Sequence, residues 1–135
     1  MALQYSVSVR NAKLDAVETA TGTAALLRIR TGAPPAACVT ADSGTVVATV
    51  NLPSDWMNAA SSGTKTLLGT WQDASADAAG TAGHFRIYDT AGTTCHIQGT
   101  VTGTGGGGDM TVDNPVFAAG QSFTVTTFTL TAGNA

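Results

Sequence analysis

The chain has 135 residues, a length that one domain can fill with its own hydrophobic core, without disulfides or metals to hold it. Its net charge is −3, and its six Lys and Arg residues are scattered, which argues against binding to a nucleic-acid backbone, because such binding needs clustered cations. No segment approaches the roughly 20 apolar residues of a membrane span, and the N-terminus lacks a signal-peptide pattern, so we expect neither membrane insertion nor export.

The surface is expected to be largely neutral. Hydrophobic residues make up 43% of the chain and charged residues only 11%, whereas roughly a quarter of the residues in an ordinary soluble domain are charged. A monomer with so few charges would be poorly solvated over much of its area. We therefore expect partner proteins, or copies of the same chain, to cover part of the surface.

The N-terminal region has the spacing of a helix. Apolar residues recur at intervals of three, four and seven, which predicts a helix over residues 6–20; they are Leu3, Val7, Leu14 and Val17. Ser6 is suited to the N-cap and Gly22 to the C-cap. The other face is polar and should be solvated or face a partner; it carries Arg10, Asn11, Lys13, Asp15 and Glu18.

After Gly22 the pattern changes to the alternation of a strand. Residues 24–31 predict a strand with Arg28 and Arg30 on its polar face. Residues 32–44 are rich in Pro, Gly and short polar side chains and predict a loop, and the Val-rich residues 45–52 predict the next strand. Ser54 or Asp55 could then cap a short helical turn that places Trp56 and Met57 against the sheet.

The second half of the chain predicts further strands. Residues 65–71 predict a strand, and residues 72–82 a loop that could be a hairpin tip, an interface arm or a mobile cover. Residues 83–102 predict a hairpin with Phe85 and Ile87 on one face and, on the other, His84, Arg86 and Tyr88. Residues 110–112 and 122–131 complete the set. In the last strand the apolar phase changes, which requires a β-bulge near Thr126 and Thr127 or burial of both faces.

These elements predict a mainly β fold. We expect an antiparallel β-sandwich or jelly-roll-like domain over residues 24–131, preceded by one short N-terminal helix. No tandem repeat is visible.

No pattern of catalytic or metal-binding residues is evident. Cys38 and Cys95 lack metal or redox spacing and, in a reducing cytoplasm, would be small core residues. His84 and His96 could approach each other on the predicted hairpin, but a site would need a third ligand such as Asp89, which more often bonds its own turn.

Other candidate sites are also weak. Asp109, Thr111 and Asp113 share a face but lack the calcium-loop spacing, so we expect a polar strand face. The glycine-rich stretch 103–108 lacks the GK[ST] ending of a phosphate loop and predicts a flexible loop. No serine lies in a nucleophile elbow, and no motif pairs two carboxylates for sugar hydrolysis. No cofactor, metal or catalytic activity is therefore expected.

Several segments spread over nearly the whole chain are distinctive in combination; they are LQYSVSVRNAKLDAVETATG, LRIRTGAPPAAC, LPSDWM, GTAGHFRIYD, TTCHIQGTV, GGGGDM and FTLTAGNA. Together they resemble a group of small structural proteins of tailed bacteriophages. The resemblance implies a place in the virion, assembled in the host cytoplasm, and the charge and hydropathy given above predict no nucleic-acid or membrane partner. It carries no motif of named binding residues.

Within that setting we expect a capsid decoration or cement protein that contacts the major capsid protein and copies of itself. The contacts are expected from the N-terminal segment and the two long loops; the candidate residues are Leu3, Tyr5, Val7, Arg10, Pro34, Pro35, Asp73 and Asp77. The alternative is a collar, neck or tail-fibre module that binds a host receptor or glycan by stacking sugars on Trp56, Trp71 and Tyr88.

Overall fold

A computed structural model describes residues 2–134. Its one helix, α1 (Val7–Thr21), confirms the helix predicted over residues 6–20. The Ser6 side chain accepts a hydrogen bond from Val9 N at 3.2 Å, and the chain leaves the helix at Gly22, whose φ of 96° favours glycine. Both predicted caps are therefore confirmed.

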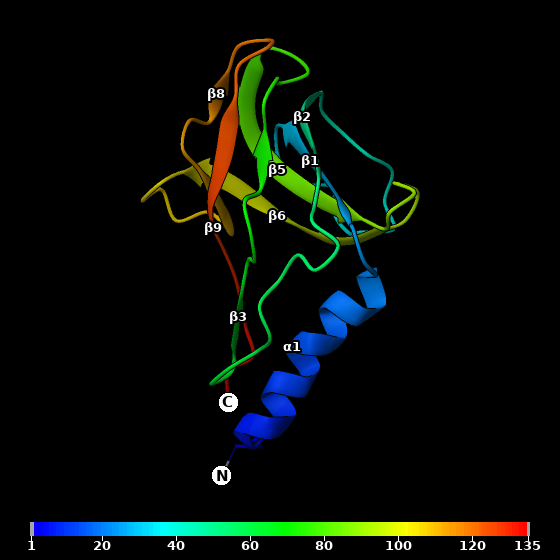
Figure 1. The fold of residues 1–135 in the computed structure, drawn as a ribbon, viewed down its shortest axis with the longest axis vertical. Helices are drawn as coiled ribbons and strands as arrows, with labels where there is room; N and C mark the ends of the chain where they lie inside the picture. Colours follow the sequence, from blue (N-terminus) through cyan, green and yellow to red (C-terminus); the bar gives the residue numbers. More distant parts are fainter. Residues whose placement is uncertain (1, 135) are drawn as a thin grey trace.

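The rest of the described chain is mainly β, as predicted. The strands are β1 (Leu26–Thr31), β2 (Val46–Asn51), β3 (Thr64–Thr66), β4 (Gln72–Asp73), β5 (Gly80–Tyr88), β6 (Cys95–Gly103), β7 (Met110–Val112), β8 (Val116–Phe117) and β9 (Phe123–Thr131). Hydrogen bonds link them in the order β2-β1-β5-β6-β7-β9-β3, with β4 on β9 and β8 on β5. Figure 1 shows the resulting curl of the sheet.

The sheet is mixed and curled. All pairs are antiparallel except β6 with β7, which is parallel, so the sheet departs from the predicted antiparallel arrangement at this one pair. The curl brings β4 beside β2, where Thr49 N donates to the Asp73 carboxylate at 3.2 Å and Asp77 N donates to Val47 O at 2.8 Å. Whether the arrangement is best described as a sandwich or jelly roll stays a prediction.

The parallel connection depends on the glycine run. Only residues 104–109 join two parallel strands, a link that usually needs a dozen residues or more. The glycine run folds back on Thr102. The approach is close, since a Cβ added at Gly106 would lie only 2.7 Å from the Thr102 side chain. The Thr102 hydroxyl accepts a hydrogen bond from Gly108 N at 3.0 Å. The predicted loop is therefore a short turn in which Gly106 and Gly108 lie against Thr102, whereas Gly105 and Gly107 face open space.

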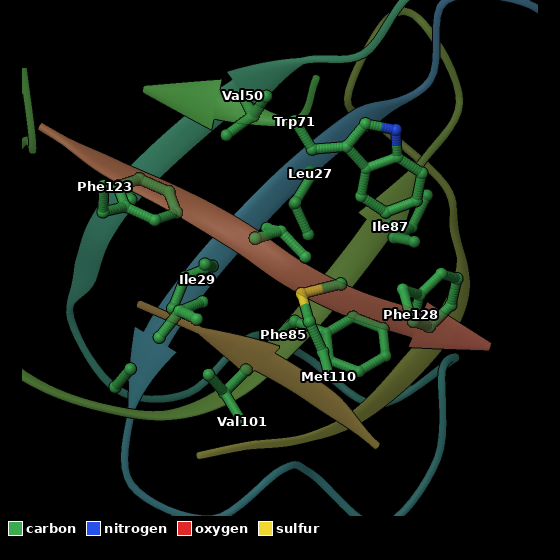
Figure 2. Close-up of a cluster of buried hydrophobic side chains, with 14 of the residues drawn as sticks. Leu27, Ile29, Val50, Trp71, Phe85, Ile87, Val101, Met110, Phe123 and Phe128 are labelled. Atoms are coloured by element: carbon green, nitrogen blue, oxygen red, sulfur yellow. The ribbon is translucent and has the colours of Figure 1, made fainter. Parts of the chain in front are cut away.

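The hydrophobic core fills the inside of the curl, where side chains from β1, β2, β5, β7 and β9 converge (Figure 2). The Phe128 ring centroid lies 5.4 Å from that of Trp71 and 5.4 Å from that of Phe85, the latter in an edge-to-face arrangement. Met110 is fully buried beside these rings.

The predicted β-bulge in the last strand is confirmed. Thr127 pairs with Thr111 and Val125 pairs with Val112, so Thr126 is the extra residue. The bulge reverses the phase of the strand, and this allows both Val125 and Phe128 to point into the core.

Residues 32–44 form the predicted loop, which we call the cover loop. It lies over the outer face of β1 and β5, the face that carries Arg30, His84, Arg86 and Tyr88. Each of these side chains is buried. The predicted alternation along β5 is correct, but its polar face is closed off by the cover loop.

Three predicted segments differ from the structure. Residues 54–57 do not form a helical turn, because Met57 instead makes a β-bridge to Leu67. The strand predicted over residues 65–71 is shortened to β3. The loop predicted over residues 72–82 contains β4 and the start of β5, whereas the hairpin of residues 83–102 is confirmed.

The helix extends away from the curled sheet, beside β3 and the end of β9, and both termini lie at this end (Figure 1). Tyr5 N donates to the Asn134 side-chain oxygen at 2.8 Å, which joins the two ends of the chain. No helix in the described part of the chain is long and apolar enough to cross a membrane.

Candidate interaction surface at the N-terminal helix

Lys65 on β3 fastens the helix to the sheet. Its ammonium nitrogen lies 2.8 Å from an Asp15 oxygen and 2.9 Å from a Glu18 oxygen, and it donates to Asn58 O at 2.9 Å. Burial opposes the charge on Lys65, but its hydrogen bonds to the two carboxylates outweigh this effect and raise its pKa. The side chain is only 2% exposed, so its charge depends on these partners.

The same helix face also binds backbone groups of residues 57–63. Asp15 accepts from Ala60 N at 2.9 Å, Asn11 accepts from Gly63 N at 2.9 Å, and Glu18 accepts from Met57 N at 3.2 Å. The prediction that this polar face is solvated or turned to a partner is therefore wrong for Asn11, Asp15 and Glu18. Their carboxylate and amide groups bind other parts of the chain, and the Asp15 side chain is 47% exposed as it does so.

The apolar side chains at the start of the chain are the ones left exposed. The exposed fractions are 71% for Leu3, 41% for Tyr5, 47% for Val7 and 44% for Val9. We call these four residues the N-terminal apolar patch. Leu14 alone of the predicted helical apolar stripe is buried.

The patch is nearly free of charge. Within residues 2–10 the one charged side chain is Arg10, which donates to Ala132 O at 3.3 Å and so faces the C-terminal strand. Lys13 lies with its ammonium 4.6 Å above the Tyr5 ring, a distance suited to a cation–π contact. The arrangement presents aliphatic surface beside a partly covered aromatic ring.

The second notable cluster lies under the cover loop. The Asp42 carboxylate accepts from Arg30 at 2.8 Å, from the Tyr88 hydroxyl at 2.7 Å, and from Arg86. Burial raises the pKa of Asp42, but the Tyr88 hydrogen bond and the charges of Arg30 and Arg86 outweigh it and lower the pKa below its ordinary value. One carboxylate thus balances two buried guanidinium groups.

The other N–H groups of Arg86 donate hydrogen bonds to the cover loop and to β6. It donates to Thr40 O at 3.1 Å, to Cys38 O at 2.5 Å and to the Cys95 sulfur at 3.2 Å. Because all its nitrogens have partners within the protein, this arginine is not available to a ligand. The cluster holds the cover loop in place.

The predicted glycan-stacking residues are not on the surface. Trp56 and Trp71 are fully buried with ring centroids 6.0 Å apart, and Tyr88 is 3% exposed beneath the cover loop. The indole nitrogens donate to Gly22 O and Leu68 O. A sugar ring needs an exposed aromatic face, so the prediction that these residues form a stacking platform is wrong.

The two histidines are not neighbours. His84 is fully buried with Nδ1 2.9 Å from Gly32 O, and the strand register places it opposite Thr100. His96 is exposed and follows Cys95, which pairs with Tyr88 at the other end of the hairpin. The predicted approach of these rings is therefore wrong, and within residues 2–134 no group of three or more His, Cys, Asp or Glu is arranged to hold a metal ion.

The other acidic candidates bind their own chain. Asp89 accepts from Thr93 N and Thr94 N, which confirms its turn role and lowers its pKa. Asp109 accepts from Thr100 N at 2.9 Å, and Asp113 accepts from Thr124 N at 3.0 Å.

Sequence patterns carried no signal for one carboxyl pair. Glu18 and Asp55 meet in a cleft of about 590 Å³ between α1 and residues 54–59, where a hydrogen bond to Glu18 raises the pKa of Asp55. Both Glu18 oxygens already bind Met57 N and Lys65, so the pair fixes the helix rather than offering a general acid and base.

The loop residues predicted to make contacts are tied to the sheet. Pro35 O accepts from the Gln98 side chain at 2.7 Å, and both Pro34 and Pro35 are half-buried. Asp73 accepts from Thr49 N, and Asp77 accepts from the Thr49 hydroxyl at 2.7 Å. An interface role for these loops stays a prediction.

No protein family, curated protein or solved structure matches the chain.

Proposed function

We propose that this chain is a non-enzymatic structural subunit of a tailed-bacteriophage virion, a decoration protein that binds the outer surface of the capsid through its N-terminal apolar patch. The observation that carries the proposal is the exposure of Leu3, Tyr5, Val7 and Val9 at one end of the molecule. The resemblance of the sequence segments to small virion proteins supplies the setting.

The size of the patch favours a repeating partner. The four residues together expose on the order of 400 Å², with Val7 and Val9 on different sides of α1. A standard interface buries about 800 Å² on each partner, so this patch alone is too small for a stable free dimer. On a capsid lattice many copies bind side by side, and contacts between neighbouring copies add avidity to each weak attachment.

The first test is the number of copies in purified virions, measured by calibrated mass spectrometry against the major capsid protein. Hundreds of copies are expected for a decoration protein. A dozen copies or fewer would contradict capsid decoration and indicate a collar, neck or fibre component. Absence of the protein from virions would overturn the virion proposal itself.

The second test is the double substitution Leu3→Ser and Val7→Ser, assayed by co-sedimentation with particles that lack the wild-type protein. Removing two exposed apolar side chains costs little folding stability, and we expect binding to fall at least about tenfold. The matched control is Val39→Ser and Val116→Ser, which removes two exposed valines at 96% and 60% exposure away from the patch. Equal binding by both variants would exclude the patch as the attachment surface.

A further inference from the structure

The two cysteines come together at the edge of the cover loop. Cys38 lies in the loop and Cys95 begins β6, and both are half-buried free thiols. Both line one cavity of about 460 Å³, together with Asp42, Arg86 and Tyr88. Two cysteines that are 57 positions apart in the sequence thus line the same cavity.

Arg86 connects the two cysteines directly. One nitrogen of its guanidinium donates to the Cys95 sulfur at 3.2 Å, and another donates to the Cys38 carbonyl oxygen at 2.5 Å. Since a guanidinium is a small rigid plane, these contacts place the backbone of Cys38 close to the sulfur of Cys95.

We propose that Cys38 and Cys95 form an intramolecular disulfide when the protein meets an oxidising medium, and that this bond fixes the cover loop to β6. The inference goes beyond the proposed virion role and does not depend on it. The sheet supplies one thiol and the loop supplies the other, so the bond would join the two layers that the Asp42 cluster already holds together.

The reaction is a thiol–disulfide exchange with a small disulfide such as oxidised glutathione. One cysteine loses its proton, and its thiolate attacks a sulfur of glutathione disulfide and displaces one glutathione thiolate. The second cysteine thiolate then attacks the protein sulfur of this mixed disulfide and displaces the other glutathione. The protein loses two protons and two electrons, and one glutathione disulfide becomes two glutathione thiols.

The surroundings slow this reaction at neutral pH. Burial raises the pKa of the Cys95 thiol, and the neighbouring Cys38 thiol acts in the same direction, against the lowering effect of Arg86. Because the thiolate is the reacting form, closure of the bond should accelerate as the pH rises. The two thiols therefore react slowly with disulfides at neutral pH, and they form the intramolecular disulfide in an oxidising medium.

The test equilibrates the full chain with graded ratios of reduced to oxidised glutathione at about pH 8, where thiol exchange is practical. Free thiols are then alkylated, and intact mass, peptide mapping and thermal unfolding are measured. We expect a monomer that has lost two hydrogen atoms, a cross-linked peptide pair containing residues 38 and 95, and a rise in Tm of roughly 10 °C. Hydrogen exchange should slow in residues 32–44.

Cys38→Ser and Cys95→Ser are the controls, because serine keeps the size and a hydrogen-bonding group. Each should show no rise in Tm on oxidation, and the wild-type rise should reverse with a reductant. Two alkylatable thiols at every glutathione ratio, stable glutathione adducts on both cysteines, or disulfide-linked dimers would each overturn the proposal. An internal bond that leaves Tm and exchange in residues 32–44 unchanged would overturn its role in fixing the loop.

Discussion

Asp42 is the one residue on which the packing of the cover loop most depends. It accepts hydrogen bonds from Arg30, Arg86 and Tyr88, which are all buried on the outer face of β1 and β5. The substitution Asp42→Asn keeps the shape but leaves two guanidinium groups without a counter-charge. We expect a loss of about 2 kcal/mol in the free energy of unfolding, less than for a fully buried pair, because the Asp42 side chain is 36% exposed.

The same residue predicts how stability depends on pH. The pKa of Asp42 is lower in the folded protein than in the unfolded chain, where an aspartate titrates at about 3.9. Its contribution is therefore complete above about pH 4 and is lost as the pH falls through the folded pKa. Urea unfolding at about pH 7 and pH 3 should show the difference between wild type and Asp42→Asn shrinking in acid. Asp77→Asn, at an exposed carboxylate, should change stability by less than about 0.5 kcal/mol; equal losses in both variants would contradict the role of Asp42.

At the scale of elements, the sequence predicted those features that depend on residues close together in the chain. The caps of α1, the hairpin of residues 83–102 and the bulge at Thr126 follow from side-chain type and spacing alone. The burial of His84 and Arg86 does not, because it depends on where the cover loop lies, and alternation along a strand carries no information about a distant segment. The Met57 bridge to Leu67 likewise outweighs the helical preference of residues 54–57.

The candidate interaction surface was likewise predicted only in part from the sequence. The exposed apolar residues of the N-terminal segment were predicted as contacts from their chemistry, and the structure leaves them uncovered. The polar helix face was misassigned because its partners, Lys65 and the backbone of residues 57–63, are far away in the sequence. A charged residue on a short helix can bind another element or lie in solvent, and only the tertiary contacts distinguish these roles.

Because polar contacts hold α1 against β3, we expect the helix to unfold locally while the sheet stays folded. Lys65→Met removes the charge that binds Asp15 and Glu18, while the core of the sheet stays unchanged. We expect amide hydrogens of residues 7–21 to exchange at least about tenfold faster, and those of β1 and β5 to keep their rates. Lys13→Met, at an exposed lysine of the same helix, is the control. Equal acceleration in helix and strands would show that they unfold as one unit.

The whole molecule has two ends with different structures. The curled sheet and its cover loop form a closed body, in which the polar groups named above bind one another. The other end carries α1, both termini and the apolar patch (Figure 1). The proposed attachment therefore uses the end where the chain begins and finishes, and the glycine turn between β6 and β7 lies on the curled sheet instead.

This polarity predicts where added sequence is tolerated. A short Gly/Ser insertion after Gly105 enters an exposed turn where a side chain would meet nothing within 4 Å, so Tm should change by less than about 4 °C and particle binding should persist.

A folded domain fused after Asn134 would lie beside Tyr5 and the apolar patch, because Tyr5 N and the Asn134 side chain are 2.8 Å apart. We expect this fusion to fold normally but to lose particle binding in co-sedimentation. The same domain joined through a long flexible linker should recover binding, since it can then move clear of the patch. The opposite pattern, with binding lost on insertion after Gly105 and kept by the direct fusion, would place the attachment surface on the sheet end of the molecule.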